Sequence, residues 1–161
     1  MHVHLVQHGD ALSEEQNAQR PLSDMGRATV VRVARFLVAC GPHWIDPPIG
    51  EMRHSGKLRA RETTEILGQA LCPQVRPTAV EGMQPKDDPA GIRAELESRR
   101  DEHTALMLVG HLPHLARLTG LLLTDDAGKS LVRFVNAAIL RLSFHGGDWA
   151  GDWYVTPACV P

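Results

Sequence analysis

The sequence has few cysteines, no long apolar run and no excess of positive charge. Its three cysteines, Cys40, Cys72 and Cys159, are odd in number and widely spaced, which fits reduced thiols in a cytoplasmic protein better than a disulfide framework. No stretch reaches about 18 uninterrupted apolar residues, and no basic leader precedes an apolar run, so the sequence predicts neither a membrane span nor a signal peptide. A formal net charge of -2 gives no basic field for nucleic acid.

What remains is the composition of an ordinary globular protein. The chain has 161 residues, of which 43% are hydrophobic and 22% charged. A domain of this length buries roughly two thirds of the surface that its unfolded chain exposes. No internal repeat, linker or low-complexity tract divides it. We therefore expect one domain spanning residues 1–161.

Apolar runs of strand length alternate with helical patterns along the chain. Strands are predicted at 3–7, 50–53, 78–80, 104–109, 138–144 and 153–155. Helices are predicted from the N-cap Ser23 to Gly41, from Leu58 to Cys72, over 90–100 and from Pro113 to Leu123, with a further short element at 132–135. This alternation predicts an α/β fold with one mainly parallel sheet covered on both faces.

The first strand ends abruptly at His8-Gly9-Asp10. Such a strand delivers an imidazole to the carboxyl edge of the sheet, where open α/β folds bind ligands. Gly9 has no Cβ, so the chain can turn sharply there and a ligand can approach closely. On this stretch alone, a histidine that merely satisfies the end of a strand explains the pattern equally well.

Two other segments point to the same edge. Cations crowd residues 55–61, at the start of a predicted helix, although a helix N-terminus already carries partial positive charge. An anion bound there removes the conflict, and Arg59 is the candidate ligand. The strand 104–109 ends just before His111. Two imidazoles and a guanidinium suit a phosphoryl group, and an imidazole can attack phosphorus as a nucleophile.

Four segments resemble the histidine phosphatase superfamily, whose fold is phosphoglycerate mutase-like, and within it the short SixA-type phosphohistidine phosphatases. They are His8-Gly9-Asp10-Ala11, Arg20-Pro21-Leu22-Ser23, Ser55–Thr63 and Val109–Pro113. The resemblance implies a three-layer α/β/α sandwich in which His8 accepts the phosphoryl group and water then hydrolyses it.

The resemblance also implies a role for each site residue. His8, Arg59 and His111 are the implied catalytic residues, the last two holding phosphoryl oxygens. Gln7, Gly9 and Arg20 are implied in substrate binding, with Arg20 at the pocket mouth. The implied substrate is a protein phosphohistidine or a small labile phosphate, and no metal or organic cofactor is implied.

Position 7 departs from the family pattern. The family motif is Arg-His-Gly, whereas this chain has Gln7 before its histidine. A neutral amide replaces a permanently charged fork, so we expect weakened catalysis. Arg20, Arg53, His54 or Lys57 could supply the missing charge. A catalytically weakened pseudo-phosphatase that binds phosphorylated partners is the alternative.

The leaving-group acid of larger superfamily members has no obvious counterpart here. Glu81 lies in the corresponding stretch, but Gly82 aligns equally well, so Glu81 is either an acid or an exposed loop carboxylate. A phosphorylated histidine has a good leaving group and needs less acid assistance. The substrate and the oligomeric state do not follow from the sequence.

Other histidines offer weaker candidates. His2 and His4 alternate on one strand and define a His-rich metal-binding module as a third hypothesis, although solvated strand-end residues explain them better. His114 either lines the pocket or lies on the surface. The three tryptophans are expected to pack rather than to stack on bases, because no basic stripe accompanies them.

Overall fold

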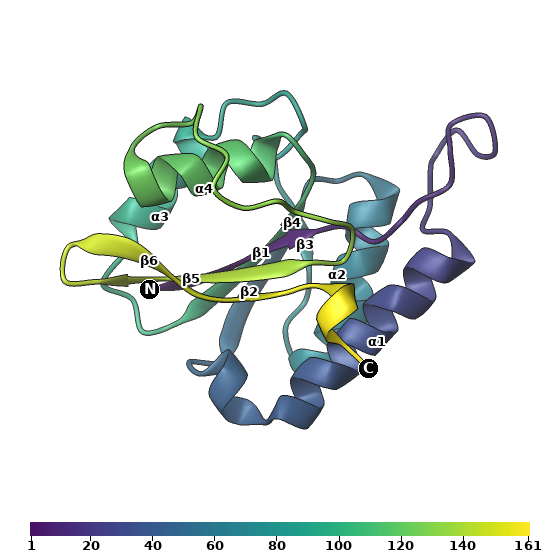
Figure 1. The fold of residues 1–161 in the computed structure, drawn as a ribbon, viewed down its shortest axis with the longest axis horizontal. Coiled ribbons are helices and arrows are strands. Elements are labelled where there is room, and N and C mark those ends of the chain that lie inside the picture. Colours follow the sequence, from purple (N-terminus) through teal and green to yellow (C-terminus); the bar gives the residue numbers. More distant parts are fainter.

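The computed structural model describes residues 1–161. Its strands are β1 (His2–Gln7), β2 (Ile49–His54), β3 (Thr78–Ala79), β4 (Ala105–Gly110), β5 (Ile139–His145) and β6 (Asp148–Val155). Its helices are α1 (Asp24–Cys40), α2 (Leu58–Leu71), α3 (Ala90–Ser98) and α4 (His114–Thr124), with short 3-10 helices η1 (Pro42–Ile45) and η2 (Pro157–Cys159). Figure 1 shows these elements around one twisted sheet.

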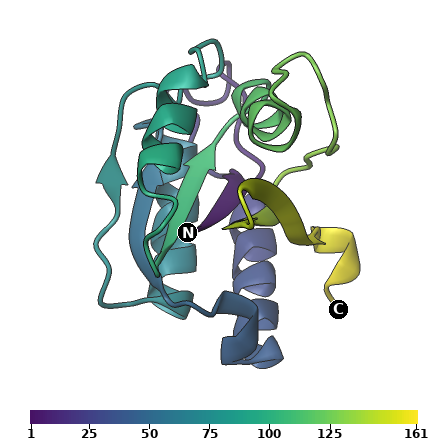
Figure 2. The same cartoon turned by 90° about the vertical axis from the view of Figure 1, so that its left-hand side faces the viewer.

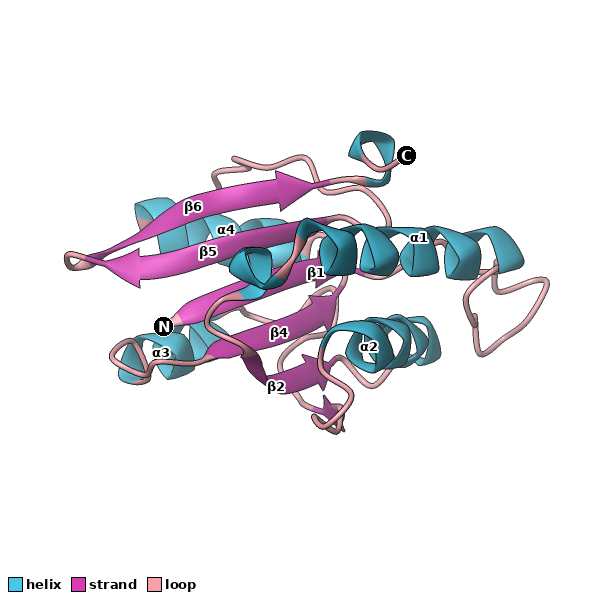
Figure 3. Cartoon of the chain, turned by 90° about the horizontal axis from the view of Figure 1, so that it is seen from below, coloured by secondary structure: helices cyan, strands magenta, loops and turns pink.

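The sheet has the strand order β3-β2-β4-β1-β5-β6. The first four strands run parallel, whereas β5 is antiparallel to β1 and β6 is antiparallel to β5. The prediction of a mainly parallel sheet is therefore confirmed. The parallel pairing places the ends of β1, β2 and β4 at one edge (Figure 3).

Helices cover both faces of the sheet, which confirms the three-layer α/β/α architecture (Figure 2). Alternate residues of β1 enter two separate apolar clusters, because successive side chains of a strand point to opposite faces. Val6 packs with residues of α1 and α2, such as Val30 and Leu67. Val3 packs on the other face with residues of α3 and α4, such as Leu115. The central strand β1 is thus fixed from both sides.

The local sequence signals at its two ends predicted the position of α1. Ser23 caps the helix by accepting a hydrogen bond from the Gly26 N–H, and Gly41 ends it with φ of 87°. Gly26 also has no room for a side chain, because a Cβ there would lie 2.0 Å from the Asp10 carbonyl oxygen. The helix therefore packs directly against the segment that follows His8.

Two predictions at the C-terminal side need correction. The short element expected at 132–135 is a loop, and the last strand begins at Asp148 rather than at Trp153. The turn at Gly146-Gly147, where both residues have positive φ, folds β6 back onto the whole of β5, and this pairing extends the strand. Trp149 is buried, and Trp44 and Trp153 pack with ring centroids 5.5 Å apart, as expected.

No helix has the length and apolar character required to cross a membrane. The three cysteines form no disulfide.

Candidate active site

The three predicted catalytic side chains meet at the carboxyl edge of the sheet. β1, β4 and β2 are neighbours, and the residues that directly follow them are His8, His111 and Ser55. The His8 N–H donates to the Gly110 carbonyl oxygen at 3.2 Å, which continues the strand pairing beyond β1. The first turn of α2 then places Arg59 against His8.

Hydrogen bonds fix the tautomer of His8. Its Nδ1 lies 2.6 Å from the Gly9 carbonyl oxygen, which can only accept, so Nδ1 carries the proton. The lone pair of the neutral ring is then on Nε2, where the Arg59 Nε–H donates at 3.2 Å. His8 Nε2 therefore faces a guanidinium.

Both histidines are neutral at pH 7. Burial lowers the pKa of His8 from 6.5 to about 4, and the positive charges of Arg59 and Arg20 act in the same direction. Burial also lowers the pKa of His111 to about 3, with smaller contributions from His8 and Arg59. A neutral His8 retains the lone pair that a nucleophile needs.

A serine that the sequence did not single out orients His111. The Ser55 hydroxyl lies 2.6 Å from His111 Nε2, whereas the buried His111 Nδ1 has no partner. The rings of His8 and His111 are 4.7 Å apart between centroids and inclined at 61°. The position of Ser55 directly after β2 was the available signal for this role.

Thr63 links the turn after β1 to α2. Its hydroxyl donates to the Arg59 carbonyl oxygen at 2.7 Å and accepts from the Gly9 N–H at 3.0 Å. A Cβ on Gly9 would lie 2.7 Å from Val30 Cγ2, so α1 occupies the space beside this glycine. On the side where a Cβ would lie, the close neighbour of Gly9 is therefore helix α1.

Gln7 lies at the end of β1 with a buried side chain. Its backbone is fully used, since the N–H donates to the Ala138 carbonyl and the carbonyl accepts from the Ala137 N–H. The side-chain Oε1 is buried without a hydrogen-bond partner. Leaving such an acceptor unsatisfied costs about 1–3 kcal/mol.

Two of the four residues expected to replace the missing charge lie near the histidines. Arg20, held by a 3.2 Å bond from its Nε–H to the Leu12 carbonyl oxygen, lowers the pKa of both His8 and Arg59 by its charge. Lys57 acts in the same way on His111. These side chains therefore add positive potential at the edge.

The other two residues are engaged elsewhere. Arg53 forms ion pairs with Glu51 and Glu95, the latter at 2.7 Å. His54 Nδ1 accepts from the Gly56 N–H at 3.1 Å, and burial lowers the pKa of His54. Neither side chain therefore belongs to the group of residues around His8.

Glu81 lies on the surface beside the site. It lines a hollow of about 780 Å³ together with Ser55, Gln84 and two aspartates. The Gln84 side-chain amide donates to the Ser55 carbonyl oxygen at 2.5 Å, which ties this loop to the residue that contacts His111. Glu81 itself is exposed and has no hydrogen-bond partner.

The remaining histidine expectations change with the structure. His114 is fully buried, so its surface placement is wrong. His4 is also buried rather than solvated, and burial lowers its pKa to about 3. The Arg141 guanidinium lies 2.8 Å from His2 Nδ1, which places a cation where a metal ligand was considered. No group of three or more His, Cys, Asp or Glu side chains is arranged to hold a metal ion.

Comparison with solved structures places this geometry in a known fold. A SixA protein histidine phosphatase complexed with tungstate superposes with a TM-score of 0.83 at 24% identity, covering 99% of each chain. The chain has the fold of the histidine phosphatase superfamily. A protein of Agrobacterium tumefaciens provisionally assigned as a SixA phosphohistidine phosphatase matches with a TM-score of 0.73 at 19% identity, over 97% of each chain.

The histidine phosphatase fold also includes more distant matches. A mycobacterial glucosyl-3-phosphoglycerate phosphatase in complex with VO3 has a TM-score of 0.71 at 17% identity, over 94% of this chain and 97% of that one. No model of a protein family and no curated protein matches the sequence. The predicted fold is therefore confirmed by the matches to solved structures and not by sequence similarity.

Proposed function

We propose that this protein is a phosphatase that acts through a covalent phosphohistidine on His8. The observation that carries the proposal is the neutral His8 ring, whose Nδ1–H donates to the Gly9 carbonyl and whose Nε2 faces Arg59 at 3.2 Å. This arrangement presents a lone pair next to a cation. It suits attack on phosphorus, because negative charge on the phosphoryl oxygens then lies beside the guanidinium.

The reaction has two displacements at phosphorus. In the first, a bond forms between His8 Nε2 and phosphorus while the bond to the leaving group breaks, and the leaving group departs with the electron pair. The Nδ1–H continues to donate to Gly9, which stabilises the positive ring. In the second, water attacks phosphorus, the P–Nε2 bond breaks, the water proton passes to solvent, and His8 returns to its neutral form as inorganic phosphate leaves.

The surrounding donors supply the electrostatic stabilisation in this proposal. Arg59 and His111 hold phosphoryl oxygens, while Arg20 and the Gln7 amide contribute from the mouth and from the end of β1. Removing one such preorganised donor typically costs about 3 kcal/mol in the transition state. The Gly9 carbonyl fixes the His8 ring by accepting a hydrogen bond from Nδ1, and the lack of a Cβ at Gly9 lets α1 pack beside this residue.

A protein phosphohistidine or a similarly labile small phosphate is the proposed substrate. An imidazole leaves more readily than an alkoxide, so the reaction needs little help from an acid. This matches a site in which Glu81 is exposed in the adjacent hollow and the hydrogen-bond partners of the His8 and His111 rings include no carboxylic acid. The tungstate complex described above belongs to a protein histidine phosphatase.

Gln7 favours a second candidate function. An amide in place of a guanidinium weakens transition-state stabilisation more than it weakens binding, because charge accumulates on the oxygens during transfer. A protein that binds phosphorylated partners with little turnover is consistent with this substitution.

Brief reaction with radiolabelled phosphoramidate, followed by an alkaline quench, tests the proposal. We expect an acid-labile label on the wild-type protein that is lost on a chase with unlabelled donor. His8→Ala should abolish labelling, whereas His103→Ala, at an exposed histidine, should retain it. Label that persists in folded His8→Ala would refute the mechanism, and phosphate binding without labelling would establish the second candidate.

A further inference from the structure

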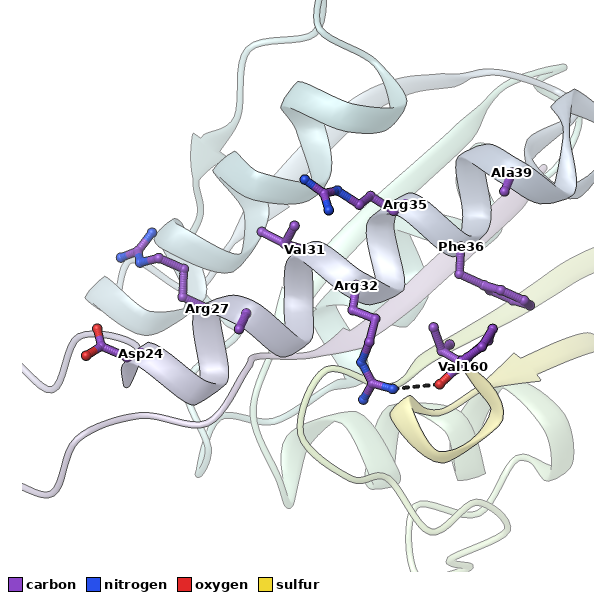
Figure 4. A pocket seen from close by; sticks show the side chains of 10 residues that line it. Asp24, Arg27, Val31, Arg32, Arg35, Phe36, Ala39 and Val160 are labelled. Carbon is purple, nitrogen blue, oxygen red and sulfur yellow. Dashed lines mark hydrogen bonds between the residues drawn. The ribbon is translucent and has the colours of Figure 1, made fainter.

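The outward face of α1 lacks a covering element. The helix buries Gly26, Val30, Val33, Ala34 and Leu37 against the sheet. Its opposite side, together with the C-terminal residues that follow η2, lines a groove of about 750 Å³ (Figure 4). We call this the α1 groove; its apolar lining consists of Ala28, Val31, Phe36, Ala39, Val160 and Pro161.

Two further apolar side chains of α1 are exposed outside the groove. Met25 near the start of α1 is 73% exposed, and Val38 near its end is 53% exposed. Single exposed apolar residues need no explanation, but a continuous apolar strip marks a contact surface. From Asp24 to Ala39 the groove follows the helix for about 22 Å at 1.5 Å per residue, a length that accommodates a helix of about four turns.

Arginines border this strip on both sides. Figure 4 shows Arg32 directed to one side of α1, where its Nη1–H donates to the Val160 carbonyl at 2.6 Å. Arg27 and Arg35 are directed to the other side. Arg27 pairs with Glu62 at 2.7 Å, whereas Arg35 takes part in no hydrogen bond or ion pair. The one acidic side chain of the lining is Asp24, so the side chains that line the groove carry a net positive charge.

Charge identifies the kind of occupant. A second copy of this chain packed through the same face would bring arginines against arginines, and juxtaposed like charges cost stability at an interface. An amphipathic helix with an acidic polar face satisfies both features, since its apolar stripe fills the strip while carboxylates meet the flanking guanidinium groups. We propose that the α1 groove binds an acidic amphipathic helix of a partner protein.

The groove begins close to the candidate active site without being part of it. Ser23, the cap of α1, donates to the Asp10 carboxylate at 2.7 Å, and Asp10 is two residues after His8. A helix docked in the groove therefore lies beside the edge that carries His8. The proposal stands on the groove alone and does not depend on phosphatase activity.

The test uses a fluorescein-labelled synthetic helix built from leucine and glutamate, and a matched peptide in which lysine replaces glutamate. Fluorescence anisotropy should show binding of the acidic peptide only, with amide shifts confined to α1 and 157–161. Arg35→Glu should weaken binding by about tenfold and Arg35→Gln by less. Arg35 has no partner to lose, so neither change should disturb the fold.

The matched control is Arg76→Glu, which reverses an exposed arginine without an ion pair away from α1 and should change affinity by less than about twofold. His8→Ala should bind the peptide like the wild type, so failure of the proposed catalysis leaves this test intact. Equal binding of the lysine peptide, equal effects of Arg35→Glu and Arg76→Glu, or binding of phosphatidylserine vesicles in place of the acidic peptide would overturn the proposal.

Discussion

Replacing Gln7 by arginine tests the electrostatic reasoning at the candidate active site most directly. A hydrogen bond from a charged donor contributes about 1.5–3 kcal/mol, against about 0.5–1.5 for a neutral one. The midpoints of these ranges differ by about 1.2 kcal/mol, which corresponds to nearly tenfold in rate. We therefore expect Gln7→Arg to raise kcat/KM on phosphoramidate by about tenfold, because charge on the phosphoryl oxygens grows during transfer.

The same substitution should lower stability when no anion is bound. Gln7 is 6% exposed, and Arg59 and Arg20 already place positive charge around His8. A further guanidinium without a carboxylate partner is expected to cost about 1–3 kcal/mol. A ligand at 100 times its Kd restores about 2.7 kcal/mol, so tungstate should raise the Tm of the variant more than that of the wild type.

Steady-state kinetics and thermal unfolding of three proteins decide the question. Gln7→Met keeps an unbranched side chain but removes the donor, so the rates should rise in the order Met, Gln, Arg. Gln7→Met should also be at least as stable as the wild type, because it removes the unpartnered Oε1. A folded Gln7→Arg that binds tungstate more tightly, yet turns over no faster than the wild type, would refute the reasoning.

Three further predictions concern the histidines. Ser55→Ala should lower kcat about tenfold by removing the hydroxyl 2.6 Å from His111 Nε2, with unchanged circular dichroism; an unchanged kcat would exclude an orienting role. Since the pKa of His8 is lowered to about 4 and the nucleophile must be neutral, kcat/KM, corrected for substrate ionisation, should stay level from pH 8 to about 5 and fall only below that range. A decline centred at pH 6.5 would contradict this. Burial lowers the pKa of His4 from 6.5 to about 3, so between these pH values only the unfolded state takes up the proton. This histidine should therefore make the free energy of unfolding fall by about 1.4 kcal/mol for each pH unit as the pH drops from 6.5 toward 3. Urea unfolding of His4→Leu should show a smaller loss between pH 7 and pH 5, while His103→Ala should follow the wild type.

Local signals in the sequence predicted the elements that define the fold, and nonlocal pairing decided the rest. The Ser23 cap, Gly41 and the apolar runs of β1 and β4 are local features, and each has its predicted place. The strand β2 carries charges that are unusual for a buried strand, and Glu51 pairs with Arg99 at 2.9 Å across 48 residues of sequence. The antiparallel direction of β5 likewise depends on its pairing with β1, which no local pattern encodes, whereas the Gly146-Gly147 turn is a local signal for the antiparallel pairing of β6 with β5.

The same distinction holds for the candidate site. His8, Arg59 and His111 were predicted because each lies at or just beyond a strand end, and parallel strands end at one edge. Ser55 and Thr63 were missed because their roles depend on partners 56 and 54 residues away. Such contacts form only when distant segments pack together, so the local sequence does not predict them.

The charge balance at this edge argues for a dianionic occupant. Arg20, Lys57 and Arg59 act on two neutral imidazoles, and the N-terminus of α2 adds partial positive charge, with no side-chain cap and no acidic residue in its first turn. The nearby Asp10 carboxylate is already bonded by Ser23 and, at 3.3 Å, by Asn136. Binding of a dianion adds the negative charge that the cluster lacks, and it raises the pKa of His111. A higher pKa favours the protonated form of His111, and an imidazolium is a stronger hydrogen-bond donor than the neutral ring. We therefore expect His111 to take up a proton when the phosphoryl group binds, which links recognition of the substrate to stabilisation of its transfer.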